Sequence, residues 1–309
     1  MTYIYFGSSN FSCRFLEGLV FIESAPELIV SQPDKPKGRG LRLAPTEVSM
    51  FGRARDIPVL KPISLNRTDT LEELSSFDVD FLIVADYGGI LPPSLLKTVK
   101  PMPLCVHPSL LPKYRGPAPI ERSLINGEAK TGITIFRMNE SIDAGDILAQ
   151  ESIDIEMDDN RFSLIDKLSN LGVSLFCKSI KDIESGNYEF IPQDDSKATF
   201  APKFTKQDGK IDWNKSAREI RNLIRGTLGR PSAYAYFNGS LIKVTLATII
   251  EEYIAGLPSV VVRIDKKGIY VATKEALIRL ERLKPEGKTE MDSYSFVLGN
   301  NLKVGDKFE

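Results

Sequence analysis

Apolar residues follow two alternating periods along the first two thirds of the chain. Short apolar runs predict β-strands over residues 2–6, 27–31, 58–60, 79–85, 104–107 and 131–138. Helical spacing predicts helices over 11–20, 46–54, 119–126 and, as a long amphipathic helix, about 160–183. The run over 79–85 is almost wholly apolar, which is typical of a central parallel strand covered on both faces. The alternation predicts an α/β domain built on a Rossmann-like, mostly parallel sheet.

The last third follows a different pattern. After a helix over about 216–227, short alternating strands are predicted over 233–237, 241–248, 259–264, 269–272 and 276–283. Asn238 and Gly239 form a strong hairpin turn between the first two of these strands. Such strands predict a small OB-like β-barrel, an architecture that often binds nucleic acid. A loose, polar connection over 194–204 separates the patterns, so we expect domains at 1–200 and 201–309.

Composition narrows the class of protein. Of the 309 residues, 42% are hydrophobic and 26% charged, as in ordinary soluble proteins. The first residues lack the pattern of a signal peptide, and no run has the length of a membrane span. The three cysteines, Cys13, Cys105 and Cys177, are widely spaced and predict free thiols without a metal site. The turn GSSNF after the first strand has one glycine, which disfavours a dinucleotide. We therefore expect a metal-free, cytoplasmic protein. A monomer is our working expectation for its oligomeric state, which composition does not determine.

Charge is unevenly divided along the chain. From Lys206 onward there are 18 basic and 13 acidic residues, against 22 and 28 before it. The basic last third indicates a polyanionic partner or, equally, an ordinary solubilising surface. The stretch 32–42, QPDKPKGRGLR, carries four cations and predicts an exposed, mobile loop. These cations are either phosphate contacts or a merely solvated loop: Lys35, Lys37, Arg39 and Arg42.

The candidate chemistry centres on the only histidine. His107 ends the predicted strand 104–107, on the same face as Cys105, and Pro108 begins a loop. In open α/β sheets, ligands bind where strands end in such loops, and the strand over 79–85 ends nearby in DYGGILP. Asp143 precedes a turn at Gly145, and a carboxylate beside an imidazole suits acyl transfer to an amine. The alternative is a histidine that only satisfies a backbone group at a strand end.

Several segments together resemble the methionyl-tRNA formyltransferases nearly from end to end. They are SQPDKPKGRG (31–40), DYGGILP (86–92), VHPSLLPKYRGPAPI (106–120), IDAGDIL (142–148), FTKQDGKIDW (204–213), FNGSLIKV (237–244) and GNNLKVGDKF (299–308). The resemblance implies transfer of a formyl group from 10-formyltetrahydrofolate to the amino group of methionyl initiator tRNA. It implies no metal, and no DNA or membrane partner.

The resemblance also implies roles for particular residues. His107 and Asp143 match two of the family's three catalytic residues, and Arg39 matches the tip of the loop that reaches the acceptor stem. The other cations of that loop would contact tRNA with it. The folate site would be lined by two stretches: Ser109, Leu110, Leu111 and Pro112, and Tyr87, Gly88, Gly89, Ile90, Leu91 and Pro92.

Cys105 departs from the family pattern. The third catalytic position is asparagine in the family, and a thiol is a much weaker hydrogen-bond donor than an amide. Losing one oxyanion donor typically costs about 100- to 1000-fold in rate. Two alternatives therefore stay open besides formylation of methionyl-tRNA: a weakened or inactive folate- or tRNA-binding relative, and a formyltransferase for another amine such as an amino-sugar nucleotide. A nucleophilic Cys105 is disfavoured. Asp86 and Gly89 differ from the family's commoner small and apolar residues, so the resemblance leaves the exact folate contacts there open.

Overall fold

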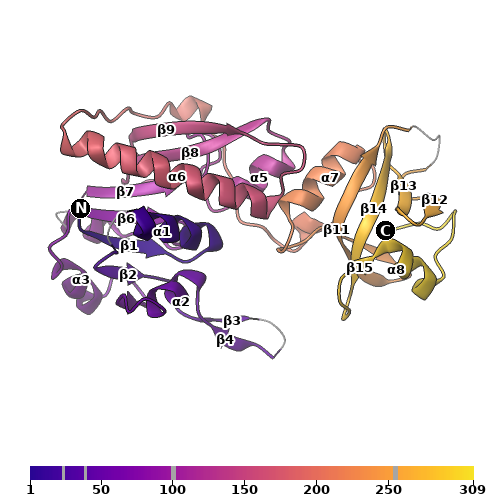
Figure 1. Ribbon diagram of the computed structural model, residues 1–309, viewed down its shortest axis with the longest axis horizontal. Helices are drawn as coiled ribbons and strands as arrows, with labels where there is room; N and C mark the ends of the chain where they lie inside the picture. Colours follow the sequence, from indigo (N-terminus) through magenta and orange to yellow (C-terminus); the bar gives the residue numbers. More distant parts are fainter. Residues whose placement is uncertain (23–24, 38–39, 99–101, 253–256) are drawn as a thin grey trace. The chain divides into compact units, whose positions relative to one another are not determined.

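Seven strands form the first sheet, in the order β5-β2-β1-β6-β7-β8-β9 (Figure 1). A computed structural model describes residues 1–22, 25–37, 40–98, 102–252 and 257–309. The strands of this sheet are β1 Tyr3–Gly7, β2 Leu28–Val30, β5 Val59–Leu60, β6 Phe81–Ala85, β7 Met102–His107, β8 Lys130–Arg137 and β9 Ile147–Asp154. The first five run parallel to one another, whereas β8 is antiparallel to β7 and β9 is antiparallel to β8. The predicted mostly parallel sheet is confirmed.

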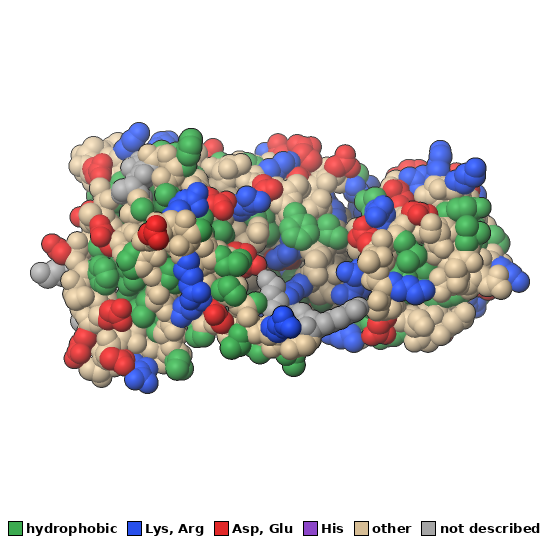
Figure 2. Space-filling view, turned by 60° about the horizontal axis from the view of Figure 1, so that its bottom comes forward, with side chains coloured by type: hydrophobic (Ala, Val, Ile, Leu, Met, Phe, Trp, Pro, Cys, Tyr) green, Lys and Arg blue, Asp and Glu red, His purple; other side chains and the backbone are tan. Residues whose placement is uncertain are grey.

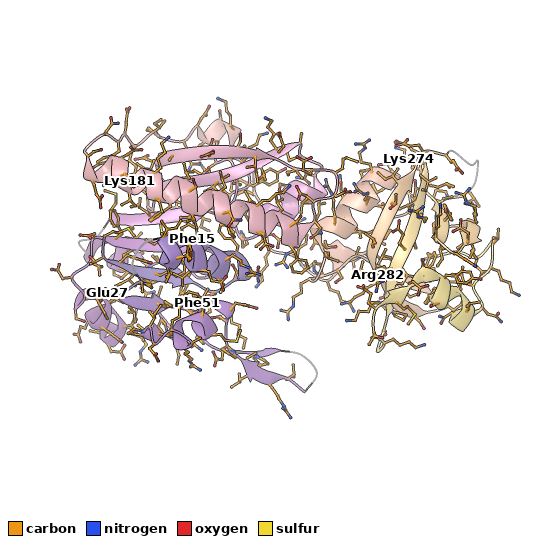
Figure 3. The ribbon with its side chains drawn as sticks, viewed as in Figure 1. Phe15, Glu27, Phe51, Lys181, Lys274 and Arg282 are labelled. Atoms are coloured by element: carbon orange, nitrogen blue, oxygen red, sulfur yellow. The ribbon has the colours of Figure 1, made fainter. Side chains whose placement is uncertain are left out.

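Helices with buried apolar residues cover this sheet. They are α1 Asn10–Ile22, α2 Glu47–Arg53, α3 Thr68–Ser75, α4 Pro93–Thr98 and α6 Arg161–Glu184. A further short helix, α5 Pro119–Ile125, precedes β8 in the chain. Helices α1 and α6 lie side by side on one face, where the rings of Phe15 and Phe176 are 5.8 Å apart (Figures 1 and 3). On the other face, Leu74 of α3 and Leu95 of α4 join a core that also contains Cys105. The carboxyl ends of β6 and β7 thus emerge between two packed layers.

The basic stretch 32–42 is only partly the loop that the sequence predicts. Strands β3 (Lys35–Lys37) and β4 (Arg42–Ala44) pair as an antiparallel hairpin. This pairing was not predicted, because the prolines and glycines of the stretch are typical of a loop. Leu41 and Leu43 are 73% and 70% exposed, so the hairpin has little core of its own.

A second, antiparallel sheet follows in the last third of the chain. Its strands are β10 Tyr234–Phe237, β11 Ser240–Ile250, β12 Val261–Asp265, β13 Gly268–Ala272, β14 Leu277–Pro285 and β15 Met291–Asp292. The order is β10-β11-β14-β13-β12, with β15 beside β14, and the predicted turn at Asn238 and Gly239 joins β10 to β11. Helix α7 (Ala217–Gly226) begins with a capping box between Ser216 and Glu219. It packs on the sheet together with α8 (Ser293–Asn300), a helix that was not predicted from the sequence.

The chain divides into two compact units. The first comprises residues 1–119, 130–154 and 163–202, and the second comprises 120–129, 155–162 and 203–309. The division of roles between domains 1–200 and 201–309 stays a prediction. The connection over 194–204 is more ordered than expected, because it contains a short 3-10 turn, Asp195–Lys197, and its backbone bonds to residues 112–118. A second 3-10 turn, Gln207–Gly209, follows it. None of the helices in the described part of the chain is long and apolar enough to span a membrane.

Candidate active site

His107 lies at the carboxyl end of β7 with its imidazole almost fully enclosed. The residue is 5% exposed, and its Nε2 is 3.0 Å from the carbonyl oxygen of Tyr114. A carbonyl oxygen can only accept a hydrogen bond, so Nε2 donates here. The other ring nitrogen, Nδ1, faces the Oδ2 atom of Asp143 at 3.7 Å. The structure therefore brings together the two side chains that the sequence singled out.

Asp143 is held by a turn with unusual backbone geometry. Its φ angle of 51° lies in the left-handed region, which aspartate tolerates better than most residues. The Oδ2 atom accepts a hydrogen bond of 2.7 Å from the backbone amide of Gly116, in the loop that follows β7. At Gly145, a Cβ atom would lie 1.8 Å from the carbonyl oxygen of Arg137, so only glycine fits. The turn is thus locked against both β8 and the β7 loop.

Two side chains connect this turn to a distant part of the chain. The amide nitrogen of Gln193 donates to the carbonyl oxygens of Asp143 (2.9 Å) and Gly145 (2.8 Å). Its amide oxygen accepts from the buried guanidinium of Arg115, which also pairs with Asp195 at 2.7 Å. The backbone carbonyls of the 143–145 turn are therefore held by the 193–195 segment as well.

The loop after His107 is fixed by a buried threonine of the neighbouring strand. Thr134 lies opposite His107 in the β7–β8 ladder and is fully buried. Its hydroxyl donates to the carbonyl of Ser109 (2.7 Å) and accepts from the amide of Leu111 (3.1 Å). The side chain of Gln150 adds bonds to the Thr134 hydroxyl and to the Leu111 carbonyl. The first part of this loop, at Ser109 and Leu111, is thus tied to β8 and β9.

Cys105 is a buried thiol rather than an exposed nucleophile. It lies two residues before His107 on β7 and packs in the core with Phe136 and Leu111. Burial, with smaller contributions from the charges of Asp143 and Asp86, raises its thiol pKa well above the ordinary value. A thiol that stays protonated at neutral pH cannot act as a thiolate, which agrees with the disfavoured nucleophilic role.

The predicted folate-lining residues divide into an accessible set and a supporting set. Tyr87, Leu91 and Leu111 are buried in the same core cluster as Cys105. Burial raises the pKa of the Tyr87 hydroxyl, which bonds to Gln32 and stays neutral. The accessible positions of the 87–92 stretch are the two glycines and Ile90, which is 74% exposed. In the 109–112 stretch, Leu110 and Pro112 are half-buried. The Ser109 hydroxyl donates a hydrogen bond to the backbone carbonyl of Lys113.

The sequence comparisons are decisive for the family. Residues 22–180 match the formyl transferase family, and residues 203–301 match the formyl transferase C-terminal domain. A methionyl-tRNA formyltransferase from Alkaliphilus oremlandii is 38% identical over 308 residues, 99% of this chain and 99% of that protein. One from Halalkalibacterium halodurans is 40% identical over 308 residues, 99% of this chain and 97% of that protein. This chain belongs to the methionyl-tRNA formyltransferase family.

Solved structures show the same formyltransferase fold at lower identity. An N-formyltransferase from Helicobacter canadensis, in complex with folinic acid and dTDP-3-aminofucose, has a TM-score of 0.67 at 20% identity, over 90% of this chain and 98% of that chain. HypX from Aquifex aeolicus in complex with tetrahydrofolic acid has a TM-score of 0.67 at 16% identity, over 96% of this chain. The match covers 46% of HypX, so this chain spans about half the length of that protein. These likenesses concern the fold alone.

The basic hairpin of this family member is described only in part. Lys35 and Arg42 are exposed, and Lys37 pairs with Arg42 in the backbone ladder. Arg39 and the side chain of Lys37 lie outside the described residues. Basic and acidic side chains are interspersed over the face drawn in Figure 2.

Several residues that hold this candidate site together are not predicted from the sequence. Thr134 lies in the strand predicted over 131–138, whereas Gln150 and Gln193 fall in no element or site that the sequence predicts above. Arg115 lay inside the quoted VHPSLLPKYRG segment without an assigned role. A signal for Thr134 existed, because a polar residue in an apolar strand usually has a buried partner. No local pattern pointed to Gln193.

Proposed function

We propose that this chain transfers the formyl group of 10-formyltetrahydrofolate to the amino group of methionyl initiator tRNA. The observation that carries the proposal is the convergence of His107 and Asp143, 3.7 Å apart, at the carboxyl end of a central strand. Full-length relatives named for this activity support it. In the reaction, a bond forms between the amino nitrogen and the formyl carbon, and the bond from that carbon to the folate nitrogen breaks.

Proton movement in this reaction is assigned to one atom of His107. The neutral amine attacks, the carbonyl oxygen becomes an oxyanion, and the proton that the amine loses must reach the departing folate nitrogen. Nε2 donates to the Tyr114 carbonyl, so Nδ1 is the ring nitrogen that exchanges protons. When protonated, Nδ1 donates a hydrogen bond to the developing oxyanion. Stabilisation of the oxyanion is usually the largest single contribution to the rate of such reactions.

Asp143 serves as the partner of that nitrogen. Its carboxylate faces Nδ1 and accepts from the amide of Gly116, so its orientation is fixed from two sides. A carboxylate in this position balances the charge of the ring while Nδ1 carries a proton. The turn geometry thereby links the charge state of the imidazole to the backbone of the β7 loop.

The two substrates would bind to different elements of the chain. The folate donor would lie against the accessible edge formed by Gly88, Gly89, Ile90 and the half-buried Leu110, with no metal. The tRNA would contact the β3–β4 hairpin through Lys35, Lys37, Arg39 and Arg42, and the second unit, whose sequence is basic overall. A hairpin with exposed cations and no core suits phosphate contacts rather than a small substrate.

The residue at position 105 bears on whether this chain is an active enzyme or an inactive relative. Because its thiol is buried and a weak donor, the oxyanion must be stabilised chiefly by His107. Formylation of another amine is not favoured by a specific observation: the amino-sugar enzyme named above is related at 20% identity, which concerns the fold.

The test is formylation of initiator tRNA charged with methionine, with 10-formyltetrahydrofolate as donor and formylmethionyl-tRNA as product. We expect product with the natural chain, and Cys105→Asn to raise kcat by up to about 100-fold by restoring an amide donor. Cys105→Ala is the control and should leave kcat unchanged. If the natural chain binds charged tRNA without forming product, and the Cys105→Asn variant forms product, the natural chain is the inactive relative. If neither protein forms product, the proposal is contradicted.

A further inference from the structure

Gln193 contacts the candidate catalytic turn from a distant part of the sequence. It lies 50 residues beyond Asp143, yet its amide nitrogen donates to the carbonyl oxygens of both Asp143 and Gly145, at 2.9 and 2.8 Å. One NH2 group therefore bridges two carbonyls of a three-residue turn. Both carbonyls belong to the turn in which Asp143 adopts its left-handed backbone.

The orientation of the Gln193 amide is fixed by chemistry. Arg115 has only donors, and both its Nε and a terminal nitrogen approach the amide oxygen of Gln193, at 3.2 and 2.8 Å. The carbonyls of the turn can only accept, so the NH2 group must face them. A flipped amide would set donor against donor and acceptor against acceptor. Arg115 thus holds Gln193 in the single orientation that clamps the turn.

The backbone brings Gln193 to the turn by a short antiparallel bridge. Ile191 and Ile147 exchange two backbone hydrogen bonds of 2.8 Å. Because this bridge is antiparallel, the residues that follow Ile191 run alongside the turn that precedes Ile147. Further along, Thr199 and Ala201 bond to the backbone of Arg115. The segment 191–201 therefore braces the turn and the His107 loop at the same time.

We infer that Gln193 is a positioning residue for formyl transfer, which holds the 143–145 turn so that the Asp143 carboxylate faces Nδ1 of His107. The inference rests on the proposed function. Gln193 does not touch the imidazole, and it acts through the turn. A displacement of about 1 Å at a reacting group can cost about 100-fold in rate, so a clamp of this kind bears on turnover rather than on substrate binding.

Two substitutions separate the clamp from mere packing. Gln193→Met keeps the volume but removes both hydrogen-bonding ends. Gln193→Glu keeps an oxygen for Arg115 but turns a second oxygen toward the two carbonyls. We expect both to lower kcat by about 10- to 100-fold with KM for both substrates unchanged. If Gln193→Glu is as active as the natural chain, pairing with Arg115 is what matters and the inference is wrong.

A double-substitution cycle tests whether Gln193 acts through Asp143. In an Asp143→Asn background, Gln193→Met should cause no further loss, because the carboxylate that it positions is already gone. Losses that multiply would show an independent, structural role. Asp194→Asn is the control from the same segment, because its side chain bonds only locally, to Ser196 and Lys197. It should leave kcat unchanged.

A spectroscopic readout decides the inference even without activity. His107 is the only histidine, so the chain gives one pair of imidazole ¹⁵N signals. Gln193→Met should move the Nδ1 signal, which faces Asp143, and leave the Nε2 signal, which is bonded to Tyr114. An unmoved Nδ1 signal would overturn the inference. Absence of formylation by the natural chain would instead overturn only the proposed function.

Discussion

The loop after β7 and the β3–β4 hairpin differ in how their polar groups are satisfied. In the β7 loop, the backbone of Ser109 and Leu111 bonds to the Thr134 hydroxyl, and Nε2 of His107 bonds to the Tyr114 carbonyl. In the described part of the hairpin, a three-residue ladder connects the strands, and the cations Lys35 and Arg42 are exposed. Both regions follow strands of the same sheet, so the contrast is one of packing and not of fold.

The difference indicates a division of labour. Formyl transfer needs an imidazole and a carboxylate held within a fraction of an ångström, which a densely bonded loop provides. Phosphate contacts need exposed cations and tolerate a mobile backbone, because the attraction is long-ranged and weakly directional. Changes in the β7 loop should therefore act on turnover, and changes in the hairpin on affinity and its salt dependence.

The largest effect is expected from His107→Ala. Removing the only imidazole takes away both proton exchange and a donor to the oxyanion, so kcat should fall by about 1000-fold. Affinity for charged tRNA should be retained, because the hairpin is untouched. The measurements are single-turnover formylation and tRNA binding on the same sample. A loss of less than tenfold, or a parallel loss of binding, would contradict the division.

Much of this arrangement was predictable because it depends on local patterns. Period-two alternation gave His107 and Cys105 a common face, and an apolar run gave β6 its central place. The positions of Gln193 and Arg115 could not be predicted, because their bonds join residues 48 to 80 positions apart and leave no periodicity. The hairpin was missed for the opposite reason: three-residue strands with proline and glycine read locally as a loop.

The next largest effect is expected at Gly145. Gly145→Ala would place a Cβ atom 1.8 Å from the backbone carbonyl of Arg137, so the 143–145 turn must move. We expect kcat to fall by about 100-fold and the free energy of unfolding to drop by about 1–3 kcal/mol. Gly299→Ala in α8 is the control, since an added Cβ there meets nothing within 4 Å. Equal activities of the two variants would mean that the turn tolerates displacement.

The hairpin should respond differently. Lys35→Ala together with Arg42→Ala should weaken tRNA binding by about tenfold and lower the salt slope by about one per lost contact. Adding Lys37→Ala and Arg39→Ala should extend both effects, whereas kcat at saturating tRNA should not change. Removing the exposed Lys178 and Lys181 of α6 is the matched control of equal charge. If both pairs weaken binding equally, net charge and not the hairpin is responsible.

The smallest effect is expected from thiol alkylation, which tests how closed the β7 region is. Burial raises the pKa of Cys13 to about 12 and that of Cys105 well above its ordinary value. A raised pKa means that the reactive thiolate forms only as the pH rises past that value, so both thiols should stay unmodified by iodoacetamide at pH 7–8. Cys177 is less buried and should be modified first, with formylation activity retained. Mass spectrometry of the peptides locates the label. Rapid modification of Cys105 near neutral pH would show that the β7 region opens to solvent, which would contradict its contrast with the exposed hairpin.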